Sequence, residues 1–393
     1  MNPYCLTISL GSACSLSCIY CYAAKESKAG TAPGWQNDHV LSLAEWIAAN
    51  CRREQKPFAL CFHGGNEPLQ YVNEIVRCIE KIEPVCRRHQ IPLQVFTTTS
   101  GVVSRESLIQ ACQLFTGITL SWDGPPAVHD QNRPFADGRP SCRKVEQTYQ
   151  LMAQMGVDVT VRSTITSTSC DAHLAIIRYF AEHHVRRVVF HPVYQDEQRS
   201  IPSHLFPTPN AFVRFFLQSR QWGAENGIIV TYSGVRLEQC HDQFCPPLQH
   251  NVSVTVDGYL TFCFLITMNS HKENNHLIYG DILDGHPFLH VEKLAALEQR
   301  ARQPFDQCAD CFIQDHCSKA CPAVCPLRDD AATRFDCRIN QWIGAALLLE
   351  RFGYCLTDQD MDNPAILIDK AIDTLRFRSR VLEGAEEASS PAH

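Results

Sequence analysis

The sequence predicts an α/β fold: a partial (β/α)6 barrel of the TIM type, followed by a small cysteine-rich α+β domain and by C-terminal helices. Two observations lead to this prediction. Short apolar runs alternate with amphipathic stretches over residues 1–235, and cysteines crowd the region after them. Strands that alternate with helices build βαβ units around a mainly parallel sheet. In such folds the reactive groups gather at the C-terminal ends of the strands.

Six apolar runs are the predicted strands, and five amphipathic stretches between them are the predicted helices. The strands are Cys5–Leu10, Phe58–Phe62, Leu93–Thr98, Gly117–Ser121, Val157–Thr164 and Val185–Pro192. The helices are His39–Arg53, Val72–His89, Arg105–Leu114, Cys142–Met155 and Cys170–His184.

The pattern changes after about residue 232. Two apolar runs, Asn251–Val256 and Tyr259–Phe264, flank Asp257-Gly258, a strong turn signal for a β-hairpin. Apolar helices are expected at Asn340–Arg351 and Asn363–Arg380. The acidic, small-residue tail from Glu383 is expected to be disordered.

Composition restricts partners and location. The chain has 393 residues, of which 45% are hydrophobic, and a formal net charge of −7. A negative net charge argues against nucleic acid as the main partner. No apolar run is long enough to span a membrane, and residues 1–13 lack the features of a signal peptide. We therefore expect a cytoplasmic protein with no nucleic-acid partner and no membrane segment.

The 21 cysteines are the outlier of the composition. In a cytoplasmic protein such a density indicates metal ligation or redox chemistry more than disulfides. Twelve of them form three groups, at residues 14–21, 240–263 and 308–337. The other nine stand singly, and each is expected to be a buried, inert thiol; these are Cys5, Cys51, Cys61, Cys78, Cys86, Cys112, Cys142, Cys170 and Cys355.

The first group, Cys14, Cys18 and Cys21, directly follows the first predicted strand. A four-iron cluster usually has four cysteine ligands. Three in one loop would leave one iron free to bind a substrate or cofactor. The alternative is a zinc site, which needs a fourth cysteine or histidine at local spacing, and the next ten residues contain none.

This Cys-x3-Cys-x2-Cys pattern resembles the signature of the radical S-adenosylmethionine (SAM) superfamily. The resemblance implies that the free iron chelates the amino and carboxylate groups of SAM. Reductive cleavage of SAM then gives a 5′-deoxyadenosyl radical, which abstracts a hydrogen from the substrate, while the protein supplies position and shelter. It also implies that Tyr20 packs near the adenine, with plain core packing as the alternative.

A glycine turn at the end of the second strand resembles the family's Gly-Gly-Glu-Pro motif. It reads Gly64-Gly65-Asn66-Glu67, and glycines there let the backbone approach a ligand closely. By the resemblance Glu67 binds the SAM ammonium. Asn66 is an insertion that departs from the family pattern.

The segment Ser121–Pro134 resembles the family's Ser-x-Asp-Gly…His-Asp-x-x-Arg pattern, which is typical of members that act on peptides and proteins. It places Ser121 near SAM. Thr97–Ser100, at the end of the third predicted strand, is expected to line the ribose. For the SAM carboxylate two arginines compete, because guanidinium matches carboxylate geometry. The catalytic base is not assigned, and the same segment contains two candidates for it. The arginines are Arg143 and Arg162, and the base candidates are Asp123 and His129.

The later cysteines resemble the SPASM domain, which houses two auxiliary four-iron clusters. All seven positions of its pattern are present, and Cys240 adds an eighth ligand. Eight ligands would fill both clusters, which favours electron transfer over substrate ligation. A pair of zinc sites is the alternative, and Cys325 is left over. The family's crossed ligation assigns Cys240, Cys245, Cys263 and Cys321 to the first auxiliary cluster and Cys308, Cys311, Cys317 and Cys337 to the second.

The implied organisation is a radical SAM partial barrel at 1–235, a SPASM domain at 236–345 and a helical segment with a disordered tail at 346–393. The cofactors are SAM and three 4Fe-4S clusters. The expected reaction is hydrogen abstraction from a peptide, followed by oxidative formation of a carbon–carbon (cyclophane) or thioether cross-link. In anaerobic sulfatase maturases an Asp acting as base follows the third ligand of the first auxiliary cluster, whereas this chain has Phe264. That difference weakens the formylglycine alternative.

Two other readings stay open: dehydrogenation of a sugar or aminoglycoside, and a zinc-binding scaffold without activity. The expected partners are a precursor peptide or protein substrate and a reductant such as flavodoxin or ferredoxin. Only 13 residues precede Cys14. We therefore expect a leader peptide to bind the barrel, the C-terminal segment or a separate leader-peptide-binding protein.

Overall fold

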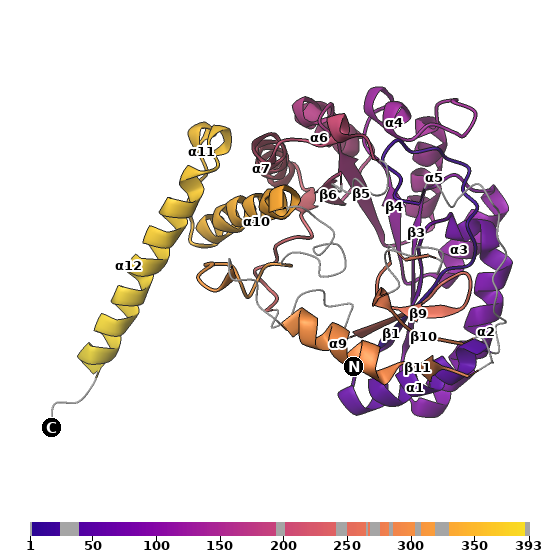
Figure 1. Ribbon diagram of the computed structural model, residues 1–393. Coiled ribbons are helices and arrows are strands. Elements are labelled where there is room, and N and C mark those ends of the chain that lie inside the picture. The colour runs from indigo at the N-terminus through magenta and orange to yellow at the C-terminus, as the bar shows by residue number, and fades with distance from the viewer. Residues whose placement is uncertain are drawn as a thin grey trace.

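The computed structural model describes residues 2–23, 39–193, 201–240, 250–264, 266–267, 276–282, 286–302, 308–318 and 330–389. Their strands form one sheet in the order β11-β10-β9-β8-β1-β2-β3-β4-β5-β6-β7 (Figure 1). The bounds are β1 Cys5–Ile8, β2 Phe58–Phe62, β3 Leu93–Thr99, β4 Gly117–Ser121, β5 Val159–Ile165, β6 Arg187–Pro192, β7 Ile229–Thr231, β8 Asn251–Val254, β9 Tyr259–Thr261, β10 Ile278–Asp281 and β11 Phe288–Leu289.

Strands β1 to β7 run parallel and pair in chain order. Helices lie between them in sequence and around the outside of the sheet in space (Figure 1). The helices are α1 His39–Glu54, α2 Val72–His89, α3 Arg105–Leu114, α4 Pro126–Asn132, α5 Cys142–Gln154, α6 His173–Glu182, α7 Pro209–Glu225, α9 Val291–Arg302, α10 Asp330–Arg351, α11 Asp358–Asp362 and α12 Ile366–Ser389. The predicted α/β class with a parallel sheet is confirmed, and the parallel part has a seventh, three-residue strand that the sequence did not predict.

Side chains alternate along the strands between two environments. Leu60, Leu120, Val161 and Phe190 are fully buried among the residues of the helices. The residues between them are only half-buried, Arg162 and His191 among them. Because successive side chains of a strand point to opposite faces, the half-buried set shares the inner face. The inner face therefore carries polar side chains such as Arg162 and His191.

The β8–β9 hairpin extends this same sheet. Strand β8 pairs in parallel with β1, so that Leu6 lies opposite Val252, and β9 and β10 continue antiparallel from it. The predicted hairpin is confirmed with shorter strands. The division at residues 235/236 and 345/346 stays a prediction, because hydrogen bonds between β1 and β8 join the two predicted domains in one sheet.

The C-terminal helices pack on the barrel at α7. Ile339 and Ile343 of α10 share a buried apolar cluster with Phe212 and Phe216 of α7 and Leu367 of α12. Helix α12 then reaches away from the body of the protein (Figure 1). It continues to Ser389, so the predicted disorder from Glu383 is wrong for residues 383–389. The Glu and Ala residues there are good helix formers.

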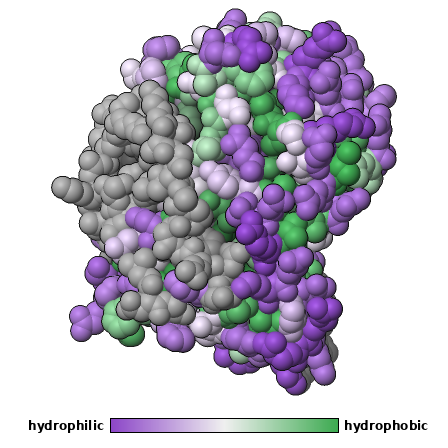
Figure 2. Space-filling model, turned by 90° about the vertical axis from the view of Figure 1, so that its right-hand side faces the viewer, coloured by the Kyte–Doolittle hydropathy of each residue, from purple (hydrophilic) through white to green (hydrophobic). Residues whose placement is uncertain are grey.

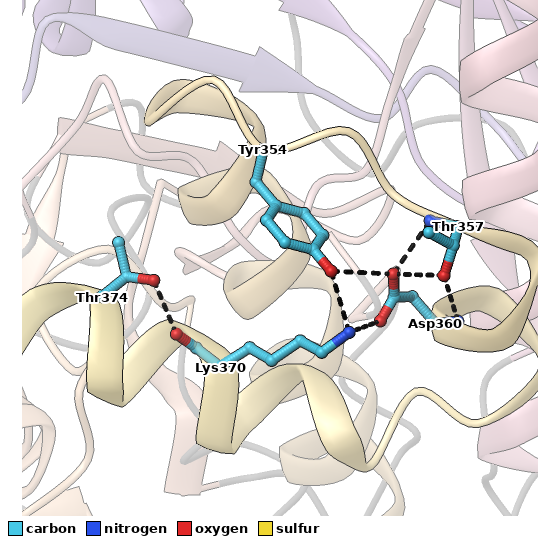
Figure 3. Close-up of polar contacts among 5 residues, drawn as sticks. All are labelled: Tyr354, Thr357, Asp360, Lys370 and Thr374. Carbon is cyan, nitrogen blue, oxygen red and sulfur yellow. Dashed lines mark hydrogen bonds and ion pairs between the residues drawn. The ribbon is translucent and has the colours of Figure 1, made fainter.

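A buried carboxylate fixes the turn between α11 and α12 (Figure 3). Asp360 has no exposed surface and accepts hydrogen bonds from the Thr357 backbone N–H and hydroxyl, at 2.9 and 2.7 Å. Lys370 donates to its other oxygen and, at 2.9 Å, to the hydroxyl of Tyr354. Burial alone would raise the pKa of Asp360, but the hydrogen bonds from Lys370 and Thr357 outweigh it and lower that pKa.

The single cysteines follow the prediction in part. Five are buried: Cys51, Cys78, Cys86, Cys142 and Cys170. Cys5, Cys61 and Cys112 are half-buried, and Cys355 is exposed, so burial was wrongly predicted for it. Cys355 lies in the loop between α10 and α11, where the neighbouring Tyr354 is also exposed.

The outer surface fits an amphipathic covering of the sheet. On the side that carries α2 and α3, hydrophilic side chains cover much of the described surface and apolar ones form smaller groups between them (Figure 2). In the described part of the chain, no helix combines the length and apolar character that crossing a membrane needs. The cytoplasmic location stays a prediction.

Candidate active site

The loop after β1 brings the first three cysteines to the C-terminal end of the sheet. It is held by the segment that follows α4: Ser17 N–H donates to Pro134 O and Ile19 N–H to Asn132 O, both at 2.9 Å. The three cysteines are half-buried. Burial is the main cause that raises the pKa of Cys14 and Cys18, and Cys21 adds to both shifts, so the three cysteines lie near one another.

The chemistry of this loop suits thiolate ligands of a cluster. Burial raises the pKa of Cys18 to about 12, and the guanidinium of Arg133 opposes that rise. Thiolates this deeply placed need a cationic partner, which a cluster and Arg133 would both supply. Among the described residues, no group of three or more His, Cys, Asp or Glu side chains is arranged to hold a single metal ion. The ligand role of Cys14, Cys18 and Cys21 stays a prediction.

Tyr20 links the cysteine loop to the end of β4. Its hydroxyl donates to Asp123 Oδ2 at 2.5 Å and accepts from Arg133 Nη1 at 2.9 Å. Asp123 also accepts from Asn132 Nδ2 at 3.0 Å and from Thr164 N–H at 3.1 Å. Arg133 belongs to the Ser121–Pro134 segment, but no role was predicted for it. Its spacing from the other residues of that segment was the signal that could have identified it.

Asp123 and His129 are placed as supports of this network. Asp123 is fully buried, and four groups surround its carboxylate, counting the charge of Arg133. His129 is also fully buried; its Nδ1 accepts the Asp123 backbone N–H at 3.2 Å, and its Nε2 pairs with the Ser141 hydroxyl at 3.1 Å. Burial, with the charge of Arg133, lowers the pKa of His129 to about 3. These positions fit structural roles, and a role as catalytic base stays a prediction for both residues.

The glycine turn after β2 is as tight as the sequence predicts. Gly64 and Gly65 have φ values of +116° and +62°. A Cβ on Gly64 would lie 2.7 Å from Ser9 Oγ, and one on Gly65 would lie 2.6 Å from Thr267 Cγ2. Only glycine fits this backbone. The turn touches the cysteine loop, because Glu67 N–H donates to Ala13 O at 2.9 Å.

The carboxylate of Glu67 is held by the end of β3, and its role in binding the SAM ammonium stays a prediction. Its Oε1 accepts from Thr99 Oγ1 at 2.7 Å and from Leu69 N–H at 3.2 Å. Its Oε2 accepts from Ser100 N–H at 2.6 Å and from Ser100 Oγ at 2.5 Å. The carboxylate is 1% exposed and has four donors, so it clamps two strand ends together. The Ser100 hydroxyl donates to this carboxylate, and its place along the ribose stays a prediction.

The inserted Asn66 has an amide group whose hydrogen-bonding atoms are unused in this turn. Both its amide nitrogen and its amide oxygen are buried and lack a partner in the structure. An unsatisfied buried polar group costs about 1–3 kcal/mol, so such groups usually mark a missing ligand or water. Sequence reasoning treated Asn66 only as a departure from the motif.

Arg162 and Ser121 lie opposite each other in the ladder between β5 and β4. Arg162 is half-buried on the inner face, near His63 of the glycine turn: burial lowers the pKa of His63 to about 4, and the charge of Arg162 adds to that shift. Arg143 is exposed on the first turn of α5. The structure therefore favours Arg162 over Arg143 as the arginine of the site.

The second predicted auxiliary group comes together from three parts of the chain. Burial raises the pKa of Cys337, on α10, to about 12, and the nearby thiols of Cys308, Cys317 and Cys311 add to it. The Cys317 segment is held after β7, where Val235 bridges to Cys317. Of the first auxiliary group, Cys240 is exposed and Cys263 is buried. Cys245 and Cys321 lie outside the described residues, as does Cys325.

Two amides of α10 approach sulfurs of that second group. Asn340 Nδ2 donates to Cys317 Sγ at 3.2 Å, and Gln341 Nε2 donates to Cys311 Sγ at 3.8 Å. Hydrogen bonds to ligand sulfurs tune the potential of an iron–sulfur cluster. The residues present therefore fit a cluster held by Cys308, Cys311, Cys317 and Cys337, although its presence stays a prediction. No sequence pattern indicated these two donors.

Curated proteins that resemble this chain include anaerobic sulfatase-maturating enzymes. The serine-type anaerobic sulfatase-maturating enzyme of Bacteroides thetaiotaomicron is 23% identical over 233 residues, which cover 56% of this chain and 54% of that protein. The cysteine-type enzyme of Clostridium perfringens is 25% identical over 210 residues, 50% of this chain and 55% of that protein. No family model matches the chain.

Over about half of its length the chain resembles the anaerobic sulfatase-maturating enzymes. It spans about half the length of the curated relatives it matches. The resemblance to radical SAM enzymes, seen first in the cysteine spacing, is thereby confirmed.

Solved structures extend the likeness over most of the fold. The anaerobic sulfatase-maturating enzyme called anSMEcpe, with bound AdoMet, superposes with a TM-score of 0.67 at 16% identity, over 93% of this chain and 98% of that one. Streptococcus suis SuiB bound to S-adenosylmethionine gives a TM-score of 0.58 at 14% identity, over 84% of this chain and 75% of that one. At such identities the likeness establishes the fold, and it confirms the predicted fold class.

Proposed function

We propose that this radical SAM relative is a peptide maturase: it oxidises a ribosomally made peptide or a protein and joins two of its side chains. The observation that carries the proposal is the convergence of the Cys14–Cys21 loop, the Gly64–Gly65 turn and Arg162 at the same ends of parallel strands. Solved relatives with peptides bound, anSMEcpe with Cp18Cys and SuiB with SuiA, support a peptide substrate.

In this proposal Cys14, Cys18 and Cys21 hold the SAM-binding cluster. When bound, the cluster and SAM supply a carbon radical that abstracts hydrogen. Arg162 binds the SAM carboxylate through its guanidinium, and Gly64 and Gly65 leave room for the cofactor. Asn66 offers one donor and one acceptor, which complements the carboxylate and ammonium of the amino-acid end of SAM.

The protein's own residues keep that site ordered and dry. Tyr20, Asp123 and Arg133 tie the cysteine loop to the ends of β4 and β5, through bonds of 2.5 and 2.9 Å and the Asp123 contact with Thr164. Glu67 ties the β2 turn to the end of β3. Positioning of this kind removes motion that would otherwise misalign the reacting atoms.

Phe264 supports cross-linking over formylglycine formation. Its ring packs edge-on against His63, with ring centroids 5.5 Å apart, at the position where the resemblance to sulfatase maturases expects an Asp. A phenylalanine cannot take a proton from a serine or cysteine side chain. The sulfatase-maturase relatives favour formylglycine formation as the second candidate.

The proposal is tested by co-expression with a precursor peptide encoded by an adjacent open reading frame. The mass of the recovered peptide is then measured. A cross-link removes two hydrogens and leaves no aldehyde. Formylglycine reacts with a hydrazide probe, so labelling of the product would favour the second candidate. Recovery of an unmodified peptide from protein with intact SAM-cleaving activity would contradict maturation of that peptide.

A further inference from the structure

Asn340 lies between an aromatic residue of the barrel and a predicted cluster ligand. The Tyr232 hydroxyl donates to Asn340 Oδ1 at 2.9 Å, and Asn340 Nδ2 donates to Cys317 Sγ at 3.2 Å. Tyr232 and Asn340 are 6% and 4% exposed. Because the tyrosine occupies the amide oxygen, the amide is oriented with its N–H toward the sulfur.

Local packing makes this orientation specific. A Cβ on Gly234 would lie 2.4 Å from Asn340 Oδ1 and 2.5 Å from Tyr232 Cε1, so the chain needs a glycine beside the pair. The same backbone segment holds the cysteine, since Ser318 N–H donates to Gly234 O at 2.8 Å. The donor and the sulfur are thus fixed to one stretch of chain.

The chain of contacts continues to the inner face of the sheet. The Tyr232 ring lies 5.6 Å from the His191 ring, centroid to centroid, at the end of β6. His191 pairs in register with Thr164, whose backbone N–H donates to Asp123. Consecutive close contacts therefore connect the surroundings of the first cysteine loop with Cys317.

We propose that Asn340, oriented by Tyr232, is a positioning residue that raises the reduction potential of the second auxiliary cluster. The inference rests on the proposed function, which puts a cluster on Cys308, Cys311, Cys317 and Cys337. A hydrogen bond to a ligand sulfur stabilises the reduced, more negative cluster more than the oxidised one. The cluster would thereby become a better electron acceptor.

The test is a redox titration of reconstituted protein followed by electron paramagnetic resonance. Cys14, Cys18 and Cys21 are first replaced by Ala, so that only the auxiliary clusters contribute to the paramagnetic signal. Asn340→Leu in that background is expected to lower the potential: at a fixed potential the ratio of reduced to oxidised cluster falls about tenfold, which is about 59 mV for one electron. Asn340→Asp keeps the shape and is expected to lower it further, because it adds negative charge.

Tyr232→Phe is the milder variant, since it removes the hydroxyl and leaves the amide in place. It is expected to lower the potential by less than Asn340→Leu. Asn226→Ala, at the exposed end of α7, is the matched control and is expected to leave the potential unchanged. If Asn340→Leu loses iron, Tyr232→Phe decides the question.

Unchanged potentials in Asn340→Leu and Tyr232→Phe, with iron content retained, would overturn the role of Asn340 while leaving the proposed function intact. A protein that retains no iron after substitution of Cys14, Cys18 and Cys21 would overturn the auxiliary clusters themselves, and the inference with them. Iron content measured beside each titration separates these two failures.

Discussion

The two best-described cysteine groups of this protein differ in what surrounds their sulfurs. The Cys14–Cys21 loop lies beside charged side chains, Arg133 and the buried carboxylates of Asp123 and Glu67. The group that contains Cys317 and Cys337 has neutral amide donors from Asn340 and Gln341, with one charged neighbour, Asp336, near Cys337. Charged neighbours suit a place that binds a charged cofactor, and neutral donors suit a permanently held cluster whose potential must be set.

The groups also differ in how the chain assembles them. Three cysteines of the first group lie within eight consecutive residues, so a single loop after one strand suffices. The second group needs residues 308–317, the α10 helix and the segment after β7 to meet. A local group is visible in the sequence, whereas a dispersed group depends on packing.

The largest effect is expected from removing the first cysteine group. Replacing Cys14, Cys18 and Cys21 by Ala is expected to abolish 5′-deoxyadenosine formation and to reduce iron from about twelve to about eight per chain. Cys355→Ala, at an exposed thiol distant in sequence from all three groups, is the control and should change neither value. Retained SAM cleavage in the triple variant would contradict the ligand role.

Removing one ligand of the second group should separate the two functions. Cys337→Ala is expected to lower iron by up to about four per chain and to abolish the net oxidation of the peptide. SAM cleavage should persist, because the first group is intact. Product analysis by mass spectrometry, with 5′-deoxyadenosine measured in the same samples, checks this. Full peptide modification by Cys337→Ala would mean that the second group is dispensable.

Asn66 sharpens the view of the first group as a cofactor site. Asn66→Ala is expected to weaken SAM binding about tenfold to a hundredfold, since two hydrogen bonds to charged groups are lost. Binding of 5′-methylthioadenosine, which lacks the amino-acid end, should be unchanged; equilibrium dialysis measures both. Equal weakening of both ligands would instead indicate a general disturbance of the turn.

In contrast to Asn66, Glu67 should act through the fold. Glu67→Gln is expected to lower the free energy of unfolding by about 1–3 kcal/mol, because buried donors of Thr99 and Ser100 lose a charged acceptor. Asn66→Ala should leave that free energy unchanged or raise it, since it removes two unsatisfied groups. Denaturant unfolding of the two variants, both without SAM, distinguishes a clamp from a ligand contact.

The smallest effect on the cysteine groups is expected at the α11–α12 turn. Asp360 has a lowered pKa in the folded protein, so its stabilisation is present above the usual pKa of about 3.9 and is lost as pH falls through the folded value. Asp360→Asn should lower the free energy of unfolding at neutral pH by about 1–3 kcal/mol, and by less in acid. Iron content should stay the same; a loss of iron would tie the C-terminal helices to the clusters.

Much of the barrel follows from the sequence because its signals are local. The observed bounds of β2, β4, α2 and α3 are those predicted, since apolar alternation and helix periodicity are fixed by neighbours in the chain. The strand β7 escaped notice, because three residues with an exposed Ile229 carry too weak a pattern. Its pairing with β6 is a tertiary event.

The sequence by itself determined the cysteine spacing after β1, the glycine turn and the alternation of strands and helices. Those features depend on residues a few positions apart. Only the tertiary structure decided that Glu67 is consumed by Thr99 and Ser100, that Asn66 keeps a free amide, and that Asn340 reaches Cys317. A side chain's partners are set by segments that meet in space. The order of residues alone does not specify which donors lie within hydrogen-bond distance of it.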